Sequence, residues 1–145
     1  MRSEDLPVIG QLPLFADMDE EHFADLMRAA YLQTFPPQVD LISEGDRADF
    51  LYVVVEGCVE LYARSNGREA TMSLVRPVST FILAAVLKDV RYLMSGRTTE
   101  KSRILLIPSE DIRRAFRQDD AFARAIVVER KFYNGHADPL RSALP

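Results

Sequence analysis

The chain has 145 residues and a mass of 16.5 kDa, with 48% hydrophobic and 28% charged residues. This size and balance suit one globular domain and exclude wholesale disorder, and no apolar run approaches the roughly 18 residues that a membrane span needs. The net charge of −4 argues against nucleic-acid binding by this chain alone, because such binding needs a concentrated basic face.

Cysteine and histidine are too few for the common metal sites. Cys58 is the single cysteine, which excludes an internal disulfide, a four-thiolate zinc site and a cysteine-held iron–sulfur cluster within one chain. The two histidines lie far apart in the sequence, so no metal-ligand cluster is predicted. The N-terminus carries acids where a secretory signal carries an apolar stretch, and we therefore expect a cytoplasmic protein without a membrane partner.

The first predicted element is a helix. Apolar residues recur at helical spacing between Phe23 and Ala30, and Asp19 or Asp17 is suited to cap the start of this segment. The consecutive prolines at 36 and 37 stop any helix and begin an extended segment.

From about residue 38 to residue 108 the pattern is typical of β-strands. Residues 50–55 (FLYVVV) are strongly β-prone, and residues 58–64 and 68–75 alternate apolar with polar side chains around Asn66-Gly67, the strongest short hairpin signal. Residues 82–90 break this pattern and predict a short helix. Further strands are expected at 92–98 and 103–107, so the chain reads as a β-barrel or sandwich.

Two helices are predicted at the C-terminal end. Residues 109–111 (SED) supply a cap and first-turn acids for one helix, and another runs from about residue 120 to 133. Phe122, Ile126 and Tyr133 share a stripe that is very apolar for a lone surface helix. The stripe either packs on the chain's own barrel or pairs with a second chain, and we take it as the candidate dimer interface.

Several short motifs follow one another in a specific order. They are residues 14–15 (LF) before a helix, 42–46 (ISEGD), 52–59 (YVVVEGCV), 66–69 (NGRE) and 105–108 (LLIP). In this order they resemble the effector domain of Crp/Fnr transcription regulators over about residues 10–135.

The resemblance implies a mainly β fold with flanking helices, namely a cyclic-nucleotide-binding-domain-like jelly-roll barrel followed by a C-terminal dimerisation helix. It implies a barrel domain at residues 1–118. Residues 119–145 would then hold the dimerisation helix and the start of a linker to a helix-turn-helix domain that is absent from this chain.

The resemblance also implies where a cyclic nucleotide would bind. Nucleotide-binding members have Phe-Gly-Glu, a short helix and then Arg-Ser/Thr, and the arginine pairs with the phosphate charge. Here Phe81 matches, but Ile82 and Leu83 stand at the glycine and the glutamate. Tyr92 and Leu93 stand at the arginine and the hydroxyl residue. A phosphate left unpaired in an apolar pocket is costly, so we expect no binding of cyclic nucleotide in the usual way.

Two arginines remain as alternative phosphate partners. Arg91 lies one residue early, although a one-residue slip in a strand turns a side chain to the opposite face. Arg97 lies on a face that the sequence does not define. The candidate ligand pocket consists of Phe81, Ile82, Leu83, Arg91, Tyr92 and Leu93.

Haem is the second candidate ligand, because some regulators of this superfamily that lack the cassette respond to nitric oxide through haem. Methionines and aromatics such as Met94 and Tyr92 either line such a site or are simply core. The residues considered for an axial ligand are His22, which we expect to be exposed, His136 and Cys58, and none of them is taken as a site residue. The cofactor is therefore left open.

These observations predict the sensory and dimerisation domain of a Crp/Fnr-type regulator, a homodimer that reaches DNA only through a helix-turn-helix domain outside this chain. A ligand would act by repositioning the helix at 120–134. The alternatives are a stand-alone protein-interaction module and a haem- or nitric-oxide-responsive sensor. We do not expect an enzyme, because the sequence has no Gly-rich phosphate loop and no paired-carboxylate motif.

Overall fold

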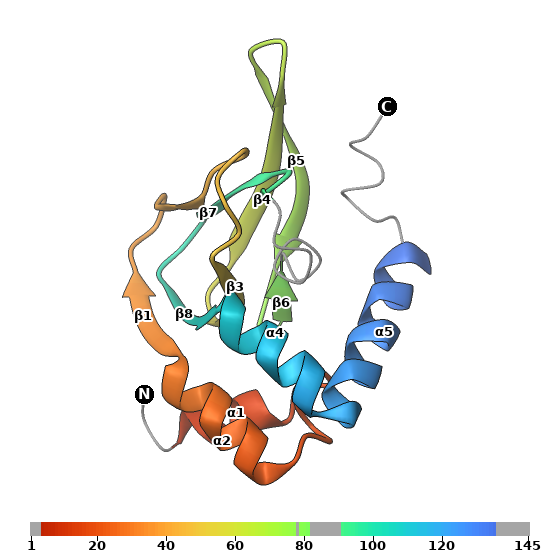
Figure 1. The fold of residues 1–145 in the computed structure, drawn as a ribbon. Coiled ribbons are helices and arrows are strands. Elements are labelled where there is room, and N and C mark those ends of the chain that lie inside the picture. The colour runs from red at the N-terminus through yellow and green to blue at the C-terminus, as the bar shows by residue number, and fades with distance from the viewer. Residues whose placement is uncertain (1–3, 78, 82–90, 136–145) are drawn as a thin grey trace.

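The computed structural model describes residues 4–77, 79–81 and 91–135, and two four-stranded antiparallel sheets form its centre (Figure 1). The first sheet has the order β1-β8-β3-β6 and the second the order β2-β7-β4-β5. The strands are β1 (Tyr31–Phe35), β2 (Asp40–Ile42), β3 (Phe50–Glu56), β4 (Val59–Ser65), β5 (Arg68–Val75), β6 (Ser79–Phe81), β7 (Ser95–Thr98) and β8 (Ser102–Pro108). Successive strands alternate between the sheets except at β4–β5, which gives the expected jelly-roll fold.

The described helices are α1 (Asp5–Gly10), α2 (Glu20–Ala29), α4 (Ser109–Gln118) and α5 (Asp120–Gly135). The first three gather at one end of the sheets, and α5 rises beside them (Figure 1). Asp19 caps α2 as predicted, because its carboxylate accepts from the backbone N–H groups of Glu21 and His22. Helix α1 was not predicted. It contains Pro7, which is tolerated because it lies within the first turn.

The hairpin predicted around Asn66-Gly67 is confirmed. Asn66 has a φ of 54° and Gly67 a φ of 79°, and these left-handed conformations make the tight turn between β4 and β5. The hairpin projects beyond the rest of the two sheets (Figure 1).

Two local predictions were wrong. The strand expected from residue 92 begins only at Ser95, because the backbone of Tyr92 bonds instead to the turn at Gly45 and Asp46. The cap expected from Ser109 is not made, since its hydroxyl donates to the carbonyl of Ala48 at 2.6 Å and no side chain caps α4.

The core lies between the sheets and beneath the helices. Val53, Val59, Ile104 and Ile107 are completely buried, and they join side chains from α1, α2, α4 and α5 in one cluster. The short helix predicted at residues 82–90 falls outside the described residues. In the part of the chain that the structure describes, every helix is too short or too polar to cross a membrane.

Candidate ligand-binding site

Tyr92 occupies the place that sequence analysis assigned to the phosphate-binding arginine. Its N–H donates to the carbonyl of Asp46 at 2.8 Å, and its carbonyl accepts from the N–H of Gly45 at 2.9 Å. These two bonds fix the backbone against the turn that precedes β3. The side chain is only 4% exposed, and its hydroxyl donates to the carbonyl of Phe50 at 3.3 Å. The phenol is therefore part of the core.

A second tyrosine belongs to the same buried cluster. Tyr52 lies on β3 opposite Phe81 of β6, and its hydroxyl donates to the carbonyl of Leu41 at 3.3 Å. Burial raises the pKa of both Tyr52 and Tyr92, so the two phenols stay neutral. Met94, 2% exposed, lies in the same cluster. These side chains are uncharged and offer a phosphate no cation.

Arg91 and Leu93 flank Tyr92 but point away from the core. The guanidinium of Arg91 is exposed and donates to the carbonyl of Gly45 at 2.7 Å. Leu93 is 50% exposed. Of the six predicted pocket residues, Tyr92 is thus buried and these two are on the surface. Phe81 is placed by its pairing with Tyr52, and Ile82 and Leu83 lie outside the described residues.

Arg97, the other arginine that sequence analysis considered, is held in an ion-pair network on the second sheet. Its guanidinium lies 2.9 Å from a carboxylate oxygen of Glu60 and 2.9 Å from one of Glu69, and it stacks on the Tyr62 ring at 4.2 Å. Hydrogen bonds to both glutamates raise the pKa of Arg97. Its neighbour Gly96 faces the buried side chains of Ile42 and Leu61 instead. Arg97 is therefore directed away from the core.

Phe122 and Ile126, two of the three predicted interface residues, are buried by the chain itself. Phe122 is 0% exposed and stacks on Phe15 with ring centroids 6.0 Å apart, and Ile126 is 1% exposed. The alternative that the stripe packs on its own domain therefore holds for these two residues. Tyr133 lies on α5, but its side chain is outside the described part. Val127, 51% exposed, faces outward on the same helix.

A junction that the sequence did not predict joins α2 to the α4–α5 corner. Asp119 is 4% exposed and accepts hydrogen bonds from the N–H of Asp19, the N–H of Phe122 and Nδ1 of His22. The His22 contact measures 2.8 Å and raises the pKa of that imidazole, while the pKa of Asp119 is lowered because these donors favour its charged form. The pairing joins residues 97 apart, so no local sequence pattern indicates it.

The positions of the candidate axial ligands show how well this site fits haem. His22 is on α2, outside the core that holds Tyr92, and one ring nitrogen is engaged with Asp119. Cys58 is buried near Ser102, whose hydroxyl accepts from the Cys58 N–H at 3.2 Å. His136 lies outside the described residues. Met94 shares a buried cluster with Tyr92, and a thioether alone makes a poor fit to haem.

Comparison with known proteins identifies the family. The profile described as the cyclic nucleotide-binding domain matches residues 32–119 of this chain. The chain belongs to the cyclic nucleotide-binding domain family. The resemblance found in the sequence is thereby confirmed, and the two sheets described above are the fold of this domain.

Solved structures with the same fold include sensory parts of transcription regulators. The sensor domain of the transcriptional regulator DNR from Pseudomonas aeruginosa superposes with a TM-score of 0.79 at 16% identity, covering 88% of this chain and 91% of that one. The N-terminal domain of a transcriptional regulator from Streptomyces coelicolor A3(2) gives a TM-score of 0.73 at 27% identity, covering 88% of this chain and 93% of that one.

A curated relative comes from a different class of protein. The potassium channel KAT1 of Oryza sativa subsp. japonica is 26% identical over 107 residues, which is 74% of this chain but 15% of the channel. The chain thus spans about a seventh of the length of that relative. Such a domain therefore occurs in proteins of very different overall activity.

Proposed function

We propose that this chain is the sensory and dimerisation domain of a Crp/Fnr-type transcription regulator that does not bind cyclic nucleotide in the family's usual way. The observation that carries this proposal is the burial of Tyr92 at the position of the phosphate-binding arginine, with its hydroxyl already bonded to Phe50. Nucleotide binding there would place a phosphate beside neutral phenols, which is unfavourable without a compensating cation.

The second part of the proposal assigns different roles to two segments of the chain. Residues 1–118 form the effector unit, and residues 119–145 carry the dimerisation helix toward a DNA-binding domain outside this chain. Asp119 supports this division, because it caps α5 while bonding to the backbone and side chain of α2's first turn. A change in the effector unit would therefore reach α5 through Asp119 as well as through the packing of Phe122 on Phe15. The domain acts in the cytoplasm and is not itself an enzyme.

A thermal-shift and absorbance screen with cyclic AMP, cyclic GMP and haem tests the sensory part. A ligand at a hundred times its dissociation constant stabilises a domain by roughly 2.7 kcal/mol, which shifts the melting temperature of a protein this size by several degrees. We expect no shift with either nucleotide. A shift with one of them contradicts the proposal, and a Soret band after haem titration would favour the haem-sensor alternative.

Light scattering coupled to size exclusion tests the dimerisation part. We expect a homodimer that Val127→Glu dissociates, because Val127 is an exposed apolar side chain on α5. Val8→Glu is the matched control, since Val8 is 43% exposed on α1. It should leave the dimer intact. A wild-type monomer at all concentrations would instead support the stand-alone interaction module.

A further inference from the structure

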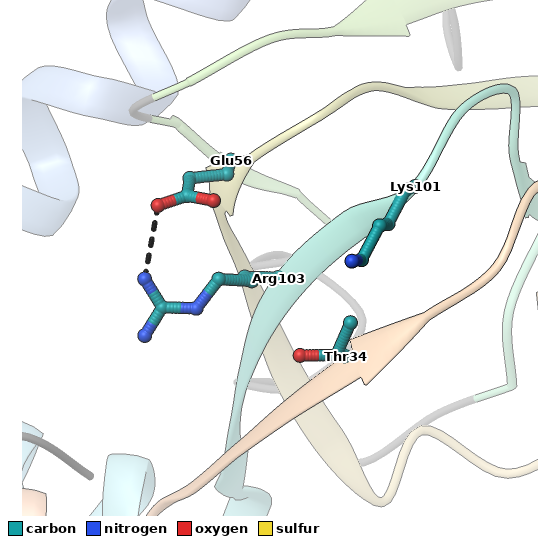
Figure 2. Close-up of a pocket in the computed structure, with 4 residues that line it drawn as sticks. All are labelled: Thr34, Glu56, Lys101 and Arg103. Atoms are coloured by element: carbon teal, nitrogen blue, oxygen red, sulfur yellow. Dashed lines mark hydrogen bonds and ion pairs between the residues drawn. The ribbon is translucent and has the colours of Figure 1, made fainter.

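A hollow of about 360 Å³ lies on the first sheet, and Thr34, Glu56, Lys101 and Arg103 line it (Figure 2). Strand register explains why these residues meet. Thr34 of β1 and Glu56 of β3 both pair with Arg103 of β8, so the three side chains form one row across the sheet. Lys101 precedes β8 by one residue, and Figure 2 shows its amine directed toward Arg103.

The charges around this hollow are arranged asymmetrically. The two terminal nitrogens of Arg103 are each 2.9 Å from a carboxylate oxygen, one from Glu56 and one from the buried Asp5 of α1. Lys101 is exposed and has no ion-pair partner among the described residues. The carboxylates therefore balance Arg103 at the end of its guanidinium, while no described carboxylate compensates the charge of Lys101 at the opposite rim.

The donors at this rim also have spare hydrogen-bonding capacity. Nε of Arg103 makes no hydrogen bond to a described residue, and the same is true of the Lys101 amine. The hydroxyl of Thr34 is directed toward the Arg103 side chain (Figure 2). Three donors of different chemistry thus face one hollow, and two of them are cationic. An acceptor with several oxygens and a negative charge would satisfy them together.

We propose that this hollow binds a small organic anion, a carboxylate or a phosphate monoester, through Lys101, Thr34 and Nε of Arg103. Thr34 and Lys101 are exposed and Arg103 is partly exposed, so the site is separate from the buried phenol of Tyr92. This anion site goes beyond the proposed sensory function, and whether it binds an anion does not depend on nucleotide binding at Tyr92. Glu56 opposes the anion electrostatically and would weaken its binding.

Amide chemical-shift titrations of the full chain test this site. Inorganic phosphate and succinate serve as probes for the two anion types, and sodium chloride at equal ionic strength is the blank. We expect saturable shifts at Thr34, Lys101 and Arg103 with at least one probe. The probe that saturates at the lower concentration identifies the preferred headgroup.

Three variants make the result specific. Lys101→Met should weaken binding about tenfold, the worth of one charge-assisted hydrogen bond. Arg68→Met removes the same charge from an exposed residue of β5 and should leave the dissociation constant unchanged. Glu56→Gln should tighten binding roughly threefold, because a nearby like charge is removed. Shifts that do not saturate, or equal losses in Lys101→Met and Arg68→Met, would overturn the proposal.

Discussion

Two glycines with left-handed backbone show how single positions shape this domain. Gly57 ends β3 with a φ of 96°, and a Cβ atom there would lie 2.1 Å from Oγ of Ser102 and 2.7 Å from the carbonyl oxygen of Lys101. Gly45 has a similar φ of 90°, but an added Cβ atom would meet nothing within 4 Å. The two positions therefore share backbone strain and differ in steric room.

This contrast predicts a difference in stability between two substitutions. Gly57→Ala should lower the free energy of unfolding by about 3 kcal/mol or more, because backbone strain adds to a clash with backbone atoms. Gly45→Ala should cost only about 1 kcal/mol, from strain alone. Urea unfolding of the two variants measures both values, and equal losses would contradict the steric argument.

The contact between His22 and Asp119 joins helix α2 to the α4–α5 corner. Hydrogen bonding to Asp119 raises the pKa of His22 above its ordinary value near 6.5. The contribution of His22 to stability is therefore complete below about pH 6.5 and is lost as the pH rises through the raised value. Asp19, which caps α2, and Glu21 in its first turn add to the effect, whereas Asp25, Asp111 and Arg114 line the adjoining surface hollow.

His22→Gln isolates this contribution, since glutamine keeps a donor but does not titrate. We expect the wild type to exceed this variant in unfolding free energy by more at about pH 5.5 than at about pH 8.5. His136 is present in both proteins, so its own titration cancels. In an Asp119→Asn background the pH dependence of the difference should disappear. A difference that is constant with pH in the wild-type background would show that the junction is not charge-assisted.

The β4–β5 hairpin provides a second prediction for an element. Arg97 bridges Glu60 of β4 and Glu69 of β5, stacks on Tyr62, and is 25% exposed. Arg97→Met should therefore lower the free energy of unfolding by about 1–2 kcal/mol. Arg64 pairs with Glu69 too, but its side chain is 65% exposed, and Arg64→Met should have almost no effect. Thermal unfolding of both variants decides the matter, and equal effects would refute the proposed role of stacking and burial.

Local signals in the sequence predicted the elements that depend on local chemistry. The Asn66-Gly67 turn and the Asp19 cap are examples, because each involves neighbouring residues. Tyr92 was assigned to a strand since its flanking residues are β-prone, yet its backbone bonds to a turn 46 positions earlier. The direction of the Arg97 side chain, away from the core, and the pairing of His22 with Asp119 also depend on tertiary contacts. The family and its fold were predicted from the motif order, whereas the site needed the structure.

At the scale of the whole molecule, folding joins two halves of opposite charge. Residues 1–50 carry eleven acidic and three basic side chains, and residues 51–145 carry eleven acidic and fifteen basic ones. Strand β8 lies between β1 and β3, and its Arg103 pairs with Asp5, 98 positions earlier. The ion pair between Arg103 and Asp5 thereby compensates part of the excess positive charge of the second half.

The packing between the two sheets also bears on which ligands the whole domain can bind. Tyr52, Tyr92 and Met94 lie in one buried cluster between the two sheets, and we propose that this packing takes the place of an anion site. The neutral phenols are bonded to backbone carbonyls, so admitting a phosphate would require both desolvation of the ligand and loss of these contacts.

Calorimetric titration of the chain with cyclic AMP, and then with cyclic GMP, tests whether this domain binds the nucleotides of its family. The buffer is matched to one in which a nucleotide-binding member of the family gives a clear isotherm. We predict only the heat of dilution up to about millimolar nucleotide, because Tyr92, at the arginine position, and the phenol of Tyr52 are neutral and offer the phosphate no cation. A saturable isotherm with a micromolar dissociation constant would contradict the central claim that this domain no longer recognises the family's ligand through that position.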